Sequence, residues 1–151
     1  MSIQRFETGP RMSQVVVNGN TVYLAGVVAN KAKGKSTTEQ TQEILSIIDG
    51  HLAKAGTDKS KLLSTNIYIT DMKNFAEMNA VWDKWVSPGN TPARATVEAK
   101  LAAPDYLVEI MILSRQRRRS KTNSNEVLQR RCTLDRLQAG WATKKSRTGT
   151  S

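Results

Sequence analysis

The chain has 151 residues, which is enough for one domain with its own hydrophobic core. Its formal net charge of +10 is unevenly distributed, because residues 1–114 carry +1 and residues 115–151 carry +9. The charge of the whole chain is therefore no argument that the main domain binds nucleic acid. We expect a domain formed by residues 1–114 and a basic, largely disordered extension formed by residues 115–151.

Several kinds of active site are disfavoured by composition. The only cysteine, Cys132, lies in the extension, so residues 1–114 contain neither a disulfide nor a thiolate nucleophile. His51 is the only histidine, and we expect a surface or structural role for it rather than a triad or a zinc site. No segment approaches the roughly 20 apolar residues of a membrane span, and the first residues lack a signal-peptide core. We expect a cytoplasmic protein.

The first structured segment is predicted to be a β-hairpin. Residues 15–17 are all valine, and Asn18-Gly19-Asn20 tolerates the positive φ angles of a tight turn. The returning strand spans Thr21 to Ala25 and is ended by Gly26. Because glycine has no Cβ, the backbone N–H of Gly26 could be approached closely by a ligand.

A helix is predicted next, after a polar and mobile loop from Lys31 to Lys35. Ser36-Thr37-Thr38 offers N-cap residues, and Glu39 would favour the positive end of the helix dipole. Apolar residues then recur at helical spacing to about Ala55, and Gly56 ends the helix.

A third strand is predicted from Lys61 to Thr70, with Leu63, Thr65, Ile67 and Ile69 on one face. Asp71 can cap a second helix that runs from Met72 to about Val86. One face of this helix carries Phe75, Met78, Asn79, Trp82 and Trp85. We expect the tryptophans to pack in a core or an interface, and Asn79 to satisfy backbone groups rather than touch a ligand.

Two more strands complete the domain. Pro92 biases the chain toward an extended conformation, so Arg94 lies at the start of a strand. Residues 106–113 form an apolar run that contains a single carboxylate, Glu109. If residues 102–105 form a turn between these strands, Arg94 and Glu109 could lie together at one end of an antiparallel pair. A structural salt bridge of Arg94 with Glu98 or Glu109 is the alternative to a functional site.

The predicted order is β-β-α-β-α-β-β, an α/β (α+β) fold with one mixed sheet and two helices on one face. Alternate residues of a strand point to opposite faces of the sheet, and here both sets are apolar. One face contains Val15, Ile67 and Ile110, and the other contains Val16 and Met111. Two helices can cover only one face. The uncovered apolar face therefore predicts oligomerisation.

Two segments carry a resemblance to a known family. Thr91 to Glu98 and Tyr106 to Ile110 resemble the YjgF/RidA superfamily of reactive-intermediate deaminases. Arg11 to Gln14, Ala25-Gly26 and Phe75 to Val86 are similar to its YoaB-like branch. This resemblance covers the chain from about Arg5 to Ser114. It implies a chorismate-mutase-like fold, a homotrimer with clefts between subunits, and no metal or organic cofactor.

The resemblance also implies an activity, the hydrolysis of 2-imino acids or their enamine tautomers to 2-oxo acids and ammonia. Arg94 matches the residue that holds the substrate carboxylate, and the Gly26 N–H matches a second donor to it. Glu109 matches the acid that positions the attacking water, and the Thr96 carbonyl matches an acceptor near the imine nitrogen. Glu109 and Arg94 are thus the catalytic candidates.

Two positions depart from the family pattern. Met12 stands where many members have an aromatic residue, and Ala25 stands where many have Ser or Thr. Both positions would contact the substrate, so these departures bear on which imino acid is preferred.

A second hypothesis, from a different functional class, is a ligand-sensing or RNA-binding, translation-inhibiting protein. It depends on the basic run at residues 115–121. This run lies in the extension, for which the family resemblance has no counterpart.

Overall fold

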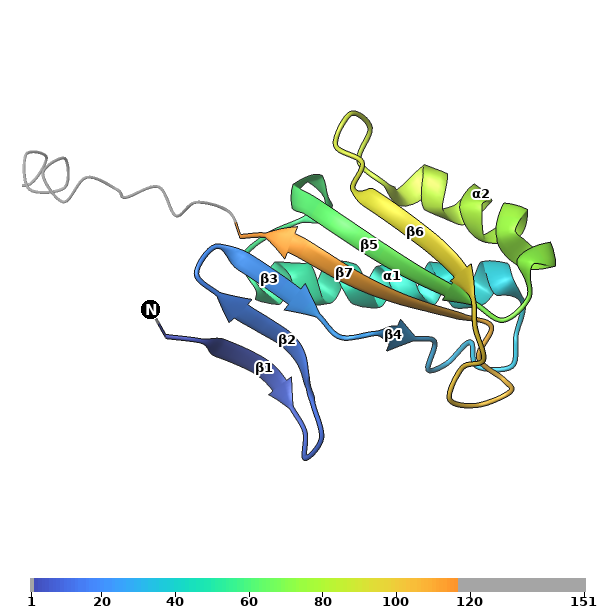
Figure 1. The fold of residues 1–151 in the computed structure, drawn as a ribbon, viewed down its shortest axis with the longest axis horizontal. Coiled ribbons are helices and arrows are strands. Elements are labelled where there is room, and N and C mark those ends of the chain that lie inside the picture. The colour runs from blue at the N-terminus through green and yellow to red at the C-terminus, as the bar shows by residue number, and fades with distance from the viewer. Residues whose placement is uncertain (1, 117–151) are drawn as a thin grey trace, which may run out of the picture. The chain divides into compact units, whose positions relative to one another are not determined.

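The computed structural model describes residues 2–116, which form one mixed β-sheet with two α-helices (Figure 1). The strands are β1 (Gln4–Thr8), β2 (Ser13–Asn18), β3 (Thr21–Leu24), β4 (Val27–Val28), β5 (Leu62–Ile69), β6 (Ala93–Glu98) and β7 (Val108–Arg115). Their spatial order is β1-β2-β3-β7-β5-β6, and β4 also pairs with β7. Only β5 and β6 are paired in parallel. The expected fold class is confirmed.

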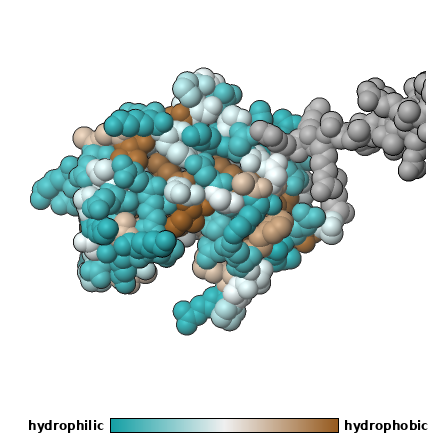
Figure 2. Space-filling model, turned by 180° about the vertical axis from the view of Figure 1, so that it is seen from behind, coloured by the Kyte–Doolittle hydropathy of each residue, from teal (hydrophilic) through white to brown (hydrophobic). Residues whose placement is uncertain are grey.

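Helices α1 (Thr37–Lys54) and α2 (Phe75–Trp85) pack against one face of the sheet and against each other. In Figure 1 the strands β5 and β7 lie in front of α1, and Figure 2 shows the molecule from behind, where hydrophobic groups lie between hydrophilic side chains. The core between the layers is formed by buried apolar residues of both, among them Val15, Val22, Ile44, Ile48, Ile67, Met78 and Ile110.

Helix α1 begins where the sequence predicts, whereas α2 begins at Phe75 rather than at Met72. Ser36 caps α1, since its hydroxyl accepts from the Glu39 N–H and the Glu39 carboxylate accepts from the Ser36 N–H. Short 3₁₀ turns, Lys59–Lys61 and Met72–Asn74, precede β5 and α2. Asp71 caps the second of them through the Lys73 N–H, and this hydrogen bond lowers the pKa of Asp71.

Three details of the sheet differ from the prediction. The short strands β1 and β4 were not expected, because neither segment has a run of β-branched residues longer than two. The register of β5 shifts between Leu62 and Ser64. This irregularity buries Leu62 and leaves Leu63 46% exposed, whereas Thr65, Ile67 and Ile69 lie on the buried face as expected.

The second face of the sheet is not covered by helices. This face carries Tyr23 (46% exposed), Met111 (39%) and Val97 (49%). Tyr23 and Met111 each lie between two buried residues of their own strand, and Val97 pairs with Tyr68, which lies between two buried residues of β5. This surface is called the open face below. Its apolar side chains agree with the expectation that the fold oligomerises.

His51 has a structural role at the end of α1, as expected. Its side chain is 8% exposed, and its Nδ1 lies 3.6 Å from the Glu7 carboxylate of β1, which also pairs with Lys54. Burial lowers the pKa of His51, and the half-exposed Glu7 carboxylate does not offset this effect. The imidazole is therefore mostly neutral at pH 7, and the ion pair of Lys54 with Glu7 links β1 to the helix.

The expected domain boundary falls inside the last strand. β7 continues to Arg115, the Gln116 N–H donates to the Asn20 carbonyl, and the Gln116 side chain donates to the Ala55 carbonyl. The remainder of the predicted extension, including most of the basic run at residues 115–121, lies outside the described residues. Within residues 2–116, no helix is long and apolar enough to cross a membrane.

Candidate active site

Arg94 lies near the start of β6, at the edge of the sheet. It is in parallel register with Thr65, which is buried on the helix-covered side, and its side chain extends along the same side. Its Nη1 donates a hydrogen bond of 2.8 Å to Asn79 Oδ1 on α2. The guanidinium also stacks 5.4 Å from the ring centroid of Trp82. Arg94 is thus exposed to a ligand while helix α2 fixes its orientation.

Glu109 lies on the other side of the sheet. It is in antiparallel register with Tyr68 in β5, between the buried neighbours Val108 and Ile110. Its carboxyl group fills the space beside Gly26, where an added Cβ would lie 2.9 Å from the Glu109 Cδ and closer still to Oε1. Gly26 is therefore required because Glu109 occupies this space, and its φ is not positive. The structure brings these two predicted residues together.

The expected antiparallel pairing of the Arg94 and Glu109 strands is wrong. β5 separates them, because Tyr68 in β5 pairs with Val97 on one side and with Glu109 on the other. The segment from 99 to 107 crosses β5 instead of forming a hairpin. Since Arg94 follows the helix-covered side and Glu109 the open side, the two side chains diverge within one subunit.

Salt bridges with Arg94 were the alternative to a functional role. Within residues 2–116, the structure pairs Arg94 with no carboxylate: Glu98 accepts instead from the Met72 N–H at 3.0 Å, and Glu109 is on the other face. The guanidinium of Arg94 is held by a neutral amide and an aromatic ring alone. Its charge is therefore not neutralised by a neighbouring acid.

The other predicted site residues have separate locations. Thr96, two residues after Arg94 on β6, has a buried hydroxyl oxygen without a hydrogen-bond partner in the described residues. Ala25 precedes Gly26, and its N–H donates to the Gln14 carbonyl at 3.0 Å. Met12 lies in the turn between β1 and β2 and is 48% exposed. Ala25 is thus adjacent in sequence to Gly26, which lies beside the Glu109 carboxyl group.

Asn79 was missed by the sequence prediction. Its side chain does not satisfy backbone groups as expected but accepts a hydrogen bond from Arg94. The sequence signal was the three-residue spacing of Asn79 and Trp82, which places both on one face of the helix. In the structure both side chains contact Arg94. The core role expected for Trp82 is confirmed, because only 4% of it is exposed.

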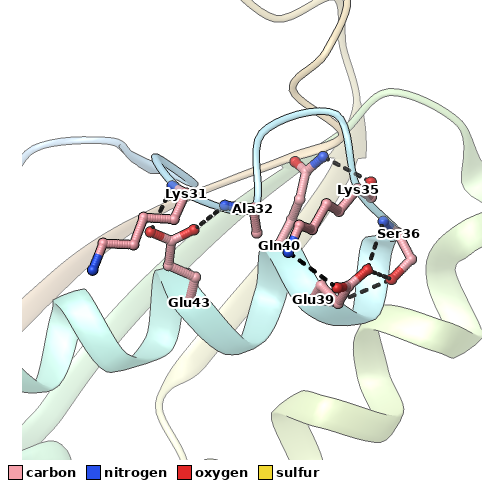
Figure 3. A network of polar contacts seen from close by, with 7 residues as sticks. All are labelled: Lys31, Ala32, Lys35, Ser36, Glu39, Gln40 and Glu43. Atoms are coloured by element: carbon pink, nitrogen blue, oxygen red, sulfur yellow. Dashed lines mark hydrogen bonds and ion pairs between the residues drawn. The ribbon is translucent and has the colours of Figure 1, made fainter.

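The loop from Lys31 to Lys35 was expected to be mobile, but hydrogen bonds fasten it to α1 (Figure 3). The Glu43 carboxylate accepts from the N–H groups of Lys31 (2.9 Å) and Ala32 (2.6 Å), and these bonds lower its pKa. The fully buried Gln40 donates to the carbonyls of Lys35 and Asp105 and accepts from the Leu107 N–H. Gln40 thereby connects the loop that follows β4 to the loop that precedes β7.

A groove of about 520 Å³ lies between α1 and α2, away from the predicted residues. It is lined by Leu45, Asp49, Val81 and Trp85, among others, and the Trp85 indole N–H donates to Asp49 at 2.9 Å. None of the predicted site residues lines it. Within residues 2–116, no three His, Cys, Asp or Glu side chains are grouped to hold a metal ion.

The sequence and structure have clear relatives. The family described as endoribonuclease L-PSP matches residues 2–116. A RutC family protein of Haemophilus influenzae is 45% identical over 114 residues, which are 76% of this chain and 98% of that protein. The RutC family protein YoaB of Escherichia coli is 42% identical over 114 residues, with the same shares of 76% and 98%.

A crystal structure of a YjgF family member from Neisseria meningitidis superposes with a TM-score of 0.75 at 45% identity. The match covers 78% of this chain and 97% of that one. Fold, length of match and identity agree with the resemblance that the motifs around Arg94 and Glu109 carry. The chain belongs to the YjgF/RidA superfamily, in its YoaB-like branch.

Proposed function

We propose that the protein is a hydrolase that deaminates 2-imino acids, with each active site shared between two subunits of a homotrimer. The observation that supports this most directly is the divergence of Arg94 and Glu109 to opposite sides of one sheet. One chain cannot place both residues on one small substrate. Arg94 of one subunit and Glu109 of a neighbouring subunit can meet in a cleft between them.

The substrate carboxylate binds to Arg94. A guanidinium presents parallel N–H donors that match the two oxygens of a carboxylate, and the Asn79 bond occupies only one nitrogen of Arg94. The N–H of Gly26 adds a donor, and the missing Cβ of Gly26 leaves room for the Glu109 carboxyl group. Arg94 and Gly26 thus bind the substrate carboxylate, whereas Glu109 acts at the imine carbon.

Glu109 orients a water molecule toward the imine carbon. The protonated imine is already electrophilic, so the water oxygen bonds to this carbon while Glu109 accepts a water proton. Glu109 returns this proton to the nitrogen of the carbinolamine, the C–N bond breaks as ammonia leaves, and the remaining hydroxyl gives its proton back to Glu109 to form the carbonyl of the 2-oxo acid. The Thr96 carbonyl accepts a hydrogen bond from the imine nitrogen. Met12 and Ala25 line the side-chain end of the substrate and set its preference.

The apolar open face supports the proposed assembly of subunits. Tyr23, Val97 and Met111 are each 39% exposed or more in the single chain, and subunit contacts would remove them from water. Light scattering at micromolar concentration should give three subunits per particle. A stable monomer would contradict both the assembly and the shared site.

Single substitutions test the residues. Arg94→Ala should reduce the rate of ammonia release from imines generated in situ by about one to two decades, the loss of a charged hydrogen bond of ~1.5–3 kcal/mol. Arg94→Lys should recover little, because an ammonium cannot bind bidentately. Glu109→Gln should lower kcat more than it raises KM. The trimer should persist in all three variants.

Mixing two inactive variants tests the sharing of the site. Arg94→Ala and Glu109→Gln subunits, refolded together in equal amounts, should regain roughly a quarter of wild-type activity, because one interface in four pairs two intact residues. If both residues served one site within a single subunit, mixed trimers would stay inactive. This result would refute the shared site even if the single variants behave as expected.

A second function is supported by the +9 charge of residues 115–151 and by the endoribonuclease name of the matching family. We propose that the basic run at residues 115–121 contacts RNA. Binding of a labelled RNA should weaken steeply with salt and vanish when the chain is cut after Gln116, while deamination is retained. RNA binding that is unchanged by this truncation would place the contact elsewhere.

A further inference from the structure

Arg94 is held in a way that differs from the four lysines that form ion pairs in the described residues. Lys33, Lys35, Lys54 and Lys73 each contact a carboxylate, of Asp105, Glu39, Glu7 and Asp71 respectively. Arg94 instead contacts the amide oxygen of Asn79 at 2.8 Å and the ring of Trp82. Its orientation is fixed, but its charge is not cancelled.

We propose that Asn79 is a positioning residue that aims Arg94 through an uncharged acceptor and so keeps the guanidinium free to bind an anionic substrate group. This inference rests on the proposed function, in which Arg94 binds a carboxylate. It assigns to Asn79 a task that neither core packing nor helix formation explains.

The anchor for this contact is rigid. Asn79 follows Met78, which is fully buried, and precedes Trp82, which is 4% exposed, so the packing of α2 fixes the position of the amide. Arg94, by contrast, is exposed and lies on an edge strand, where a long side chain would otherwise sample many rotamers. Holding it in one rotamer before binding reduces the entropy that the ligand must offset.

The chemistry of the acceptor decides the consequence. A carboxylate at position 79 would bind Arg94 more strongly than the amide does, because both partners would be charged. The same carboxylate would compete with the substrate carboxylate for the guanidinium. A neutral amide orients the cation without this competition, whereas an aspartate would improve the clamp and damage the site.

The test compares Asn79→Asp, Asn79→Ala and Asn79→Gln in the full chain. Binding of 2-oxobutanoate, a stable 2-oxo acid, would be measured by titration calorimetry. Asn79→Asp should weaken binding by about tenfold to a hundredfold, and Asn79→Ala by less than about tenfold, since it frees Arg94 without neutralising it. Asn79→Gln, which keeps a neutral acceptor, should restore part of the loss.

Two further measurements separate aiming from mere stability. The melting temperature of Asn79→Asp should equal or exceed that of the wild type, because a new ion pair forms while affinity falls. In deamination, Asn79→Asp should raise KM more than it lowers kcat. The matched control is Asn74→Asp, the same change at the start of α2, where the side chain makes no capping hydrogen bond. Its affinity for 2-oxobutanoate should remain that of the wild type.

The outcomes distinguish this inference from the proposed activity. Wild-type affinity in Asn79→Asp, or a loss of affinity matched by a loss of melting temperature in all variants, would overturn the role of Asn79. Binding that requires Arg94 and is weakened by Asn79→Asp would support that role even if no imine is hydrolysed. A wild-type protein that does not bind 2-oxobutanoate would overturn the inference, because Arg94 would then have no carboxylate to receive.

Discussion

Both faces of the sheet are apolar, but only one of them is covered by helices of the same chain. On the covered face, Ile67, Ile110 and Ile112 are at most 2% exposed, because α1 and α2 pack on them. On the open face, Met111 lies between Ile110 and Ile112 in the same strand and remains 39% exposed. One chain therefore covers only one of its two apolar surfaces, and we propose that other copies of the chain cover the second.

The same division separates the candidate site residues. Arg94 follows the covered side and is aimed by helix α2, whereas Glu109 follows the open side and is accommodated by Gly26. The covered side thus supplies a rigid anchor, and in the proposed trimer the open side would supply the surface on which subunits meet. In the proposed shared site, Arg94 from the covered side of one subunit would meet Glu109 from the open side of its neighbour.

The largest expected effect comes from a charge on the open face. Met111→Lys should convert the trimer to monomers, with a threefold lower mass by light scattering and loss of deaminase activity, because assembly would bury three unpaired ammonium groups. Met72→Lys is the matched control, since Met72 is also exposed (42%) but precedes α2 and is not part of the sheet. A trimer that persists in Met111→Lys would show that the open face is not the interface.

Neighbouring residues of β7 allow the two faces to be compared directly. Ile110→Ala should reduce the free energy of unfolding by about 2–5 kcal/mol, because it leaves a cavity in a filled core. Met111→Ala should cost less, and its cost should grow with protein concentration, since it acts on subunit association. Denaturant titrations at two concentrations measure both. Equal and concentration-independent costs would remove the distinction between the faces.

Two glycines offer a smaller and more local test. Gly26→Ala should destabilise the protein by roughly 1–3 kcal/mol and reduce kcat, because the new Cβ displaces the Glu109 carboxyl group. Adding Glu109→Ala should recover the stability but not the activity. Gly50→Ala is the control: no atom lies within 4 Å of its added Cβ, so the helix should gain up to ~1 kcal/mol. Full activity in Gly26→Ala would exclude the role of Glu109.

The smallest expected effect concerns His51. Its ordinary pKa is 6.5, and burial lowers this pKa in the folded state, so the unfolded chain binds more protons just below pH 6.5. Stability should therefore fall as the pH decreases from 6.5 toward the folded pKa. His51→Gln should flatten this part of the curve of melting temperature against pH.

A second part of that curve serves as an internal reference. Hydrogen bonds lower the pKa values of Glu39 and Glu43 from 4.5, so their contribution to stability is present above pH 4.5 and is lost as the pH falls below it. This decline should be the same in His51→Gln. A wild-type slope between pH 6.5 and 5 that the substitution does not change would show that another group titrates there.

Local patterns in the sequence determined the helices and most of the strands, and the family resemblance supplied the predicted site residues. Ser36 and Glu39 form a capping box, Gly19 permits a tight turn with φ of 59°, and Gly56 ends a helix with φ of 73°. These features depend on neighbours within a few residues. The alternation along β7 likewise showed that both of its faces are apolar.

Tertiary structure alone decided which strands are neighbours and which side chains meet. Inserting β5 between β6 and β7 separates Arg94 from Glu109, although the turn-like sequence between them suggested a hairpin. The contact of Asn79 with Arg94 depends on how α2 packs beside an edge strand. Strand order and helix packing are set by the burial of the whole core, which distributes its free energy over residues far apart in the chain, so no local pattern contains them.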